Sequence, residues 1–309
     1  MFLPFLRRFA GCVASVLLIL AIVFAIPVRA AEVLPKCCVW RVNNAKAPFY
    51  LVGSIHALSQ KDYPLPTPYE IVLGNTKRLL FEFDPTRHAE FEKKFEAAAK
   101  YPPGQDIRSK IHSDLLTWLR QNIFAVNVDP RREKKSRPEG FDSGLGYKPW
   151  WIAQHLVDKS TYSNVSMSRG LDNYLVDRAK RMGKEIGGLE SVDEHVAVLG
   201  GLSDRDGEII LLDALAHPKN DAAEFNRMHK AWRKGDTAAL WAGDAQFRKE
   251  APSIAARFVD ERNVKWMPRI EAELKSGKPT AIVAGALHFS GPNSVIALLE
   301  KRGYKIEQL

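Results

Sequence analysis

The amino-acid sequence predicts an α/β protein, close to the α+β borderline, built around a mixed central sheet with a helical cap. Two apolar strand-like segments, 49–52 and 280–284, lead into the Gly-x-x-His motifs Gly53-Ser54-Ile55-His56 and Gly285-Ala286-Leu287-His288. A loop with proline, a helix-like segment and another strand follow each motif. The region between these halves is almost entirely helix-like. This order predicts two similar halves separated by a helical insertion. Each half consists of a strand, a GxxH motif, a helix and a second strand.

The first half begins with a hairpin, because residues 38–42 and 48–52 are strand-like and flank the turn-forming residues 43–46. A helix is expected over 67–77, with Thr67 as its N-cap and Pro68 at the first helical position. The second strand, 78–84, contains Glu82 among apolar residues. The pattern then predicts helices over 89–100, 113–122, 148–159 and 171–182, a long charged loop over 127–149, and a strand over 184–190.

The helical insertion spans about 192–277 and has apolar residues at three- and four-residue spacing. Breaks are expected near 200–201, 217–218, 234–236 and Pro252. The second half then supplies strands over 280–284 and 303–307. No linker-like composition separates these parts, so residues 31–309 are expected to form a single domain.

The first thirty residues predict a cleavable secretory signal peptide. Arg7 and Arg8 precede an apolar stretch over 9–26, and Val28-Arg29-Ala30 then provides a cleavage sequence after Ala30. The mature protein is therefore expected to be secreted or periplasmic. Because the apolar stretch is long for a signal peptide, an uncleaved helix anchoring the protein in the membrane is the alternative.

Composition excludes several classes of protein. The formal net charge of +9 is spread along the chain, and the basic run at 131–137 is typical of a solvated loop, so no nucleic-acid partner is expected. Cys37 and Cys38 are the only cysteines of the predicted mature chain, which excludes a disulfide framework. We interpret them as buried apolar side chains, with a metal or haem contact or an intermolecular bridge as alternatives. The sequence also lacks the H-E-x-x-H, G-x-S-x-G, phosphate-loop and dinucleotide-binding motifs.

The residues most suited to chemistry are the two motif histidines and an acidic side chain. Glu82 lies inside an apolar strand, where a carboxylate is costly unless it is paired, hydrogen-bonded or bound to a metal. Imidazole nitrogens and a carboxylate suit a divalent ion such as manganese, cobalt or zinc. We therefore predict a metal site formed by His56, His288 and Glu82.

Three further polar residues are candidates for the same site. Glu190 ends another apolar strand, and Arg262-Asn263 precedes Trp266 on a predicted helix. Arg262 is suited to stabilising developing negative charge and Asn263 to orienting a ligand or a substrate carbonyl, although a helix-surface role for both is equally open. The other histidines, His195 among them, have no partner at ligand spacing. Most are expected at surface or packing positions, with the entry of one from a distant segment left open.

Together these segments resemble the TraB/GumN family, to which the Tiki-type metalloproteases are related. The resemblance covers residues 38–308 and is carried by the two Gly-x-x-His motifs, the acidic strand around Glu82, Gly188-Leu189-Glu190-Ser191, Arg262-Asn263 with Trp266, and Gly303-Tyr304. It implies His56, Glu82 and His288 as the core of a divalent-metal site, with Arg262, Asn263 and Glu190 around it.

The function expected on this basis is that of a secreted or periplasmic metal-dependent hydrolase. The leading hypothesis is a peptidase that uses a metal-activated water in a cleft between the two GxxH loops, with a peptide or protein as substrate. One alternative is a non-catalytic protein that binds a peptide, a signal molecule or a haem-type ligand on the same fold. A further alternative, suggested by the family name alone, is an accessory factor in polysaccharide production. The oligomeric state is left open.

Overall fold

The computed structural model describes residues 36–124, 144–156, 165–216 and 220–309, all within one compact unit that comprises Pro35–Leu309. The predicted signal peptide, most of the predicted 127–149 loop and the predicted break at 217–218 lie outside these ranges. Within them, no helix combines the length and apolar character needed to cross a membrane.

Six strands form one mixed sheet in the order β4-β3-β5-β2-β1-β6. They are β1 (Val39–Val42), β2 (Phe49–Ser54), β3 (Arg78–Phe83), β4 (Glu185–Glu190), β5 (Thr280–Gly285) and β6 (Ile306–Gln308). Strands β4, β3, β5 and β2 are parallel, whereas β1 is antiparallel to both of its neighbours. The mixed α/β class and the β1–β2 hairpin predicted from the sequence are confirmed.

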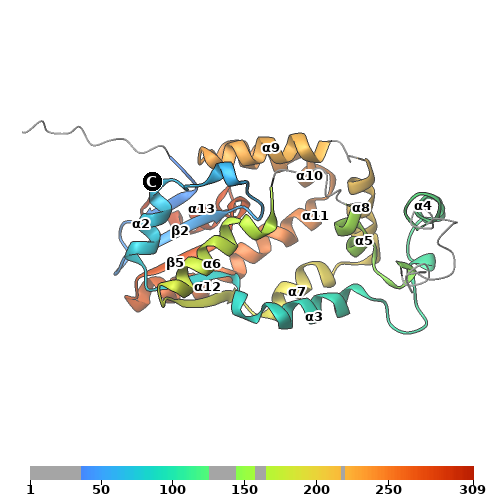
Figure 1. Ribbon diagram of the computed structural model, residues 1–309, viewed down its shortest axis with the longest axis horizontal. Helices are drawn as coiled ribbons and strands as arrows, with labels where there is room; N and C mark the ends of the chain where they lie inside the picture. The colour runs from blue at the N-terminus through green and yellow to red at the C-terminus, as the bar shows by residue number, and fades with distance from the viewer. Residues whose placement is uncertain (1–35, 125–143, 157–164, 217–219) are drawn as a thin grey trace, which may run out of the picture. The chain divides into compact units, whose positions relative to one another are not determined.

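The helices follow the predicted order. They are α2 (Thr67–Asn75), α3 (His88–Ala99), α4 (Ser113–Leu119), α5 (Pro149–Leu156), α6 (Leu171–Arg181), α7 (Val192–Gly200), α8 (Asp204–Ala216), α9 (Asn220–Arg233), α10 (Thr237–Glu250), α11 (Pro252–Ala255), α12 (Glu261–Ser276) and α13 (Val295–Glu300) (Figure 1). Thr67 is the first helical residue of α2 and Pro66 takes the N-cap position, so the predicted cap was wrong by one residue. A π-helical turn, Ala256–Asp260, precedes α12.

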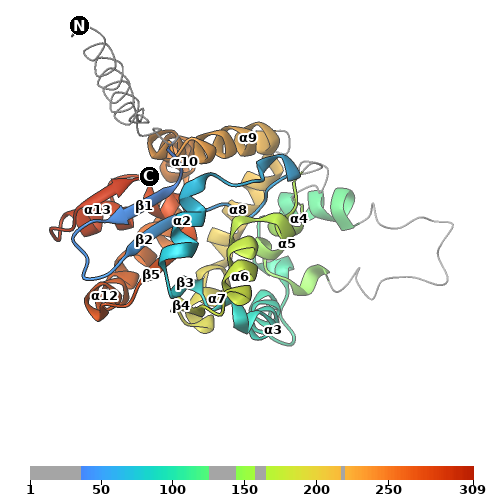
Figure 2. The same cartoon turned by 60° about the vertical axis from the view of Figure 1, so that its left-hand side comes forward.

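The chain connections place helices on both faces of the sheet. The crossover from β2 through α2 reaches β3 in one direction along the sheet, whereas the crossover from β5 through α13 reaches β6 in the other. Right-handed crossovers in opposite directions put their helices on opposite faces. Accordingly, α2 and α6 lie together, joined by Glu70 and Arg178 at 2.7 Å, and α12 packs with α13 on the other face (Figure 2).

Strands β2 and β5 are direct neighbours, so the two GxxH motifs meet at the same edge of the sheet. Ser54 pairs with Gly285, and Gly53 pairs with Ala284. A side chain at Gly53 would approach the Ala286 backbone to 3.2 Å, so a glycine allows the close approach. The connections that leave β2 and β5 diverge to opposite faces, and such a point in a parallel sheet is where α/β proteins form binding crevices.

The helical insertion lies against both GxxH loops. Trp232 of α9 donates from Nε1 to the carbonyl of Gly53 at 2.8 Å, and Arg233 of α9 binds Asp62 in the loop after β2. On the other side, α10 contacts the segment that carries His288, where Trp241 packs against Gly291. Through these contacts, α9 and α10 cover the ends of β2 and β5.

The two cysteines are buried at the start of β1. Cys37 is 1% and Cys38 0% exposed, and both thiols are free. Burial raises the pKa of Cys37 to about 12, which disfavours the reactive thiolate. The interpretation of this pair as buried apolar side chains is confirmed.

Asp62 is expected to stabilise the junction between the first GxxH loop and α9. It is 2% exposed, and its carboxylate accepts hydrogen bonds from Arg233 at 2.6 Å, His229 at 2.9 Å and Ser59 at 2.8 Å. Because Arg233 is 40% exposed, we expect Asp62→Asn to lower the free energy of unfolding by only about 2 kcal/mol at pH 7. Urea denaturation would measure this loss.

The loss from Asp62→Asn should also depend on pH. Burial would raise the pKa of Asp62, but the Ser59 backbone and hydroxyl and then Arg233 together lower it below 3.8. A depressed folded pKa stabilises the protein above the unfolded pKa, and this stabilisation disappears as pH falls through the folded value. The difference between wild type and Asp62→Asn should therefore shrink below pH 4. Asp193→Asn, at a 76% exposed position, is the control and should change stability by less than about 0.5 kcal/mol.

Candidate functional site

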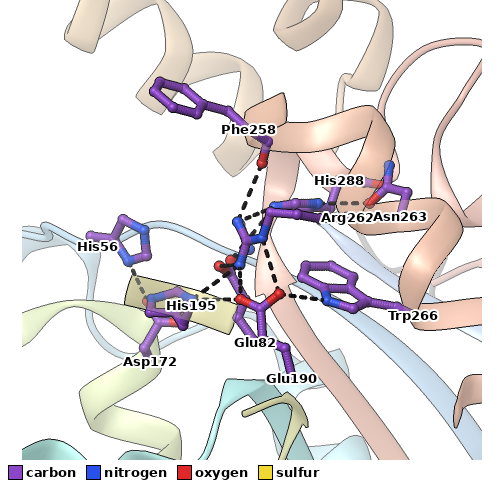
Figure 3. A network of polar contacts seen from close by, with 11 residues as sticks. His56, Glu82, Asp172, Glu190, His195, Phe258, Arg262, Asn263, Trp266 and His288 are labelled. Carbon is purple, nitrogen blue, oxygen red and sulfur yellow. Dashed lines mark hydrogen bonds and ion pairs between the residues drawn. The ribbon is translucent and has the colours of Figure 1, made fainter. Parts of the chain in front are cut away.

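Arg262 of α12 is the centre of a buried network at the carboxyl ends of the parallel strands (Figure 3). Its Nη2 donates to Glu82 Oε2 of β3 at 2.6 Å and to Glu190 Oε1 of β4 at 2.5 Å. All three side chains are largely buried: Arg262 is 10% exposed, Glu82 16% and Glu190 7%. Of the two interpretations left open for Arg262, the helix-surface ion pair is therefore wrong, because its guanidinium is the counter-charge to two buried carboxylates.

Glu82 keeps its negative charge because positively charged side chains surround it. Burial alone would raise its pKa, but the charge of Arg262, together with those of His288 and His56 in their protonated forms, lowers it well below the usual range. Its Oε1 also accepts a hydrogen bond from the backbone N–H of Gly285 at 2.8 Å. The carboxylate is thus ionised and fixed between β3 and the second GxxH motif.

Glu190 is held by three donors. Besides Arg262, Trp266 donates from Nε1 at 2.9 Å, and His195 Nδ1 lies 2.6 Å from Oε1. Burial would raise the pKa of Glu190, but the hydrogen bonds from His195, Arg262 and Trp266 lower it. Because α7 begins directly after Glu190 with a Ser191–Glu194 capping box, its first turn directs His195 back toward the end of β4.

His288 is buried, and one ring nitrogen is fixed by Asn263. Asn263 donates from Nδ2 to the Asn293 carbonyl at 2.9 Å, so its Oδ1 faces His288 Nδ1 at 2.7 Å and Nδ1 carries the ring proton. The other nitrogen, Nε2, lies 3.8 Å from Glu82 Oε1 and 3.4 Å from Arg262 Nη1. Burial lowers the pKa of His288 to about 4, which leaves the ring neutral at pH 7 with an Nε2 lone pair directed into the site.

His56 follows β2, and its Nδ1 also contacts a side-chain oxygen, here that of a carboxylate. Its Nδ1 lies 2.9 Å from Asp172 Oδ2 of α6, and its side chain is 63% exposed. The hydrogen bond to Asp172 raises the pKa of His56 to about 9. In both motif histidines a neighbouring oxygen contacts Nδ1. His56, with a pKa of about 9, also carries a proton on Nε2 at pH 7, so a metal bound there would have to displace that proton.

Gly170 explains how Asp172 reaches His56. A Cβ at this position would lie 2.0 Å from the carbonyl oxygen of His56, so only glycine lets the start of α6 pass this close. The N–H of Leu171 also donates to the Ile55 carbonyl at 3.0 Å. Asp172 is 116 residues from His56, and no spacing in the sequence pointed to this contact.

The structure brings together most of the residues singled out from the sequence. Glu82, Glu190, Arg262, Asn263 and His288 form one hydrogen-bonded network, and His56 lies beside it, where its charge acts on Glu82 and His288. Sequence reasoning missed Asp172 and His195. The S-x-x-E capping signal directly after a strand-ending glutamate is the feature that could have indicated His195.

Two sets of side chains were considered as metal ligands. Glu82, Glu190 and His195 offer ligand atoms within 4.8 Å of one another. Arg262 Nη2, however, hydrogen-bonds both carboxylates and lies 3.3 Å from His195 Nδ1, so a cation already occupies the space between them.

His56, His288 and Glu82, the predicted metal ligands, do not form such a group: among the described residues, only Glu82, Glu190 and His195 have ligand atoms that all lie within 4.8 Å of one another. Arg262 also contacts two of the predicted ligands, through Nη2 to Glu82 and through Nη1 at 3.4 Å from His288 Nε2. The donor atoms of the three predicted ligands are nevertheless those that a divalent ion prefers. Histidine ligands of metals usually direct the second ring nitrogen to a carboxylate or carbonyl oxygen, as His56 does with Asp172 and His288 with Asn263. The 3.8 Å separation of His288 Nε2 and Glu82 Oε1 is compatible with two ligands about 2 Å from one ion. These residues therefore fit a metal on their donor chemistry.

Comparison with known proteins identifies the family of this chain. Residues 38–308 match the sequence profile of the TraB/PrgY/gumN family. The chain belongs to this family. Among its curated relatives, "Uncharacterized protein YbaP" of Escherichia coli (strain K12) is 25% identical over 81% of this chain and 87% of the relative. No solved structure matches the chain.

Other relatives of this TraB/PrgY/gumN protein come from animals. "Metalloprotease TIKI2" of Danio rerio is 23% identical over 87% of this chain, and "Metalloprotease TIKI1" of the same organism is 23% identical over the same share. The matches cover 60% and 62% of the two animal proteins. The predicted family resemblance is confirmed, and the matched region of residues 38–308 contains the whole network around Arg262.

Proposed function

We propose that this protein is a metal-dependent hydrolase that cleaves peptide bonds. The observation that carries the proposal is the matched pair of histidines, in which Asp172 and Asn263 contact Nδ1 and leave Nε2 as the ligand atom, with the ionised Glu82 3.8 Å from His288 Nε2. At His56 the metal would displace the Nε2 proton. The distant similarity to proteins named metalloproteases supports a peptide as substrate. In this proposal His56, His288 and Glu82 hold a manganese, cobalt or zinc ion.

Such an ion, when bound, polarises a substrate carbonyl and lowers the pKa of water. The chain's own residues prepare the site for this chemistry. Asp172 and Asn263 set the ring orientation of His56 and His288. Arg262 keeps Glu82 ionised and holds Glu190 in place. His195, which is 20% exposed and hydrogen-bonded to Glu190, is positioned to hold or transfer a proton at the open side of the network.

Metal binding is the decisive test. We expect the wild-type protein to bind one equivalent of Mn²⁺, Co²⁺ or Zn²⁺ in calorimetry, and His56→Ala and His288→Ala each to weaken binding by about tenfold or more, since a ligand is lost. His88→Ala is a matched control, because His88 is 64% exposed and pairs with Glu92 on the surface of α3. Wild-type protein that binds none of the three ions would contradict the proposal.

Hydrolysis would then be assayed with a diverse library of quenched fluorescent peptides. Cleavage should require the metal and disappear in His288→Ala. If the metal binds and no peptide is cut, a non-catalytic binding protein on the same fold becomes the better explanation.

The proposal places the mature protein in the periplasm or outside the cell, on the basis of the leader-like residues 1–30. We expect the protein exported from a bacterial host to begin at Ala31. Mass spectrometry of the purified N-terminal peptide measures this directly. Retention of the first thirty residues in the membrane fraction would instead support the uncleaved anchor.

A further inference from the structure

Strand β4 forms one edge of the sheet and ends in the candidate site (Figure 2). Its last residue is Glu190, which binds Arg262. Its neighbour β3, which carries Glu82, pairs with it in parallel register on one side only. A partner that lined up along the outer side of β4 would therefore lead directly to the buried network.

Alternate backbone groups of β4 face away from the sheet. The N–H of Glu185 donates to the Lys77 carbonyl, so Glu185, Gly187 and Leu189 direct their N–H and C=O groups toward β3. Ile186 and Gly188 then direct theirs outward. No hydrogen bond from the described part of the chain satisfies these outward groups, and both residues are partly exposed. Donors and acceptors at every second residue are the chemistry that recognises an extended peptide backbone.

A pocket of about 160 Å³ opens beside the end of this edge. Leu189 of β4, Ala197 and Val198 of α7, and Trp266 of α12 supply the apolar part of its lining. Charged side chains supply the rest: Glu190, Glu194, Arg257, Glu261, Arg262 and Lys265. The pocket and the free edge share Leu189 and Glu190. An apolar side chain from a peptide paired with β4 would have a place to enter next to the network.

We propose that the outer edge of β4 is the docking strand for an extended peptide, with an apolar side chain of that peptide seated in the pocket between α7 and α12. The peptide adds one strand to the sheet through Ile186 and Gly188 and continues past Glu190 toward His195 and Glu82. Its identification as a substrate rests on the proposed peptidase function, whereas its docking does not need a metal.

Amide hydrogen exchange gives a direct test of the docking strand. The probe is acetyl-Lys-Ala-Ala-Leu-Ala-Ala-Lys-amide, added to the full-length protein with EDTA so that cleavage is prevented. We expect the N–H groups of Ile186 and Gly188 to exchange about tenfold more slowly with peptide, whereas Gly187 and Leu189 are protected already. Unchanged exchange at Ile186 and Gly188 under saturating peptide would overturn the proposal. Slowing that appears without peptide and grows with protein concentration would also overturn it, since a second copy of the chain would then cover the edge.

An N-methyl scan of the same peptide tests the hydrogen bonds from the ligand side. Methylation at alternate residues should weaken binding about fivefold to tenfold per lost hydrogen bond, and methylation at the residues between them should not. A uniform effect at all positions would contradict strand pairing.

The pocket is tested by Ala197→Trp, which fills it from an exposed position on α7. We expect this variant to remove the preference of the protein for the leucine peptide over its Leu→Gly counterpart. Asp193→Trp, at an exposed position of the same helix, is the matched control and should keep the preference. The outcomes separate the two proposals: protected edge amides without metal binding support docking alone, and metal-dependent cleavage without edge protection supports the hydrolase alone.

Discussion

Replacing Arg262 by methionine is expected to lower the free energy of unfolding by about 3–5 kcal/mol, the largest loss we expect for any polar residue of this protein. Arg262 is the cation between Glu82 and Glu190, and all three side chains are largely buried. Methionine has a similar length but no charge, so two buried carboxylates would lose their counter-charge. Urea denaturation in the presence of EDTA measures the loss without a contribution from bound metal.

Two further variants separate this effect from loss of packing. Arg41→Met removes an exposed pair with Glu307, in which both side chains are about half exposed, and should cost less than about 1 kcal/mol. Arg262→Met combined with Glu82→Gln and Glu190→Gln should recover much of the stability, because no uncompensated charge is then buried. If Arg262→Met is no more harmful than Arg41→Met, the counter-charge role of Arg262 is wrong.

The second large effect is expected for Gly170→Ala. This substitution adds a single methyl group, at a position outside the network around Arg262. The new Cβ would lie 2.0 Å from the carbonyl oxygen of His56, and a backbone carbonyl cannot turn away as a flexible side chain can. Either α6 or the first GxxH loop must move, at a cost of about 1–3 kcal/mol. The same movement separates His56 from Asp172, and metal affinity should fall with it.

Two measurements check the Gly170 prediction. Since the hydrogen bond to Asp172 raises the pKa of His56 to about 9, NMR titration of metal-free Gly170→Ala should give a pKa closer to 6.5. Gly74→Ala, in α2, is the matched control because nothing lies within 4 Å of its Cβ position. This helical substitution should raise stability by about 0.5–1 kcal/mol. An unchanged His56 pKa in Gly170→Ala would show that the glycine does not hold the pair together.

Several features of the site could be predicted because they follow from local pattern. Glu82 was identifiable since a carboxylate inside an apolar strand needs a partner, and the structure supplies Arg262 and the Gly285 N–H. The two GxxH motifs follow similar strands, and these strands prove to be neighbours with Ser54 opposite Gly285. The prediction of Glu82 as a metal ligand did not reveal that Arg262 is its counter-charge.

Local patterns were sufficient to predict the order of strands and helices, the two motif histidines and the acidic strand, because periodicity, glycine and capping residues act over a few positions. The pairing of side chains within the site depends on long-range folding. Asp172 reaches His56 across 116 positions, Arg262 binds Glu82 across 180, and His195 turns inward only because α7 starts where β4 ends. Such contacts depend on the opposite crossovers that leave β2 and β5, and this long-range geometry has no local signature in the chain.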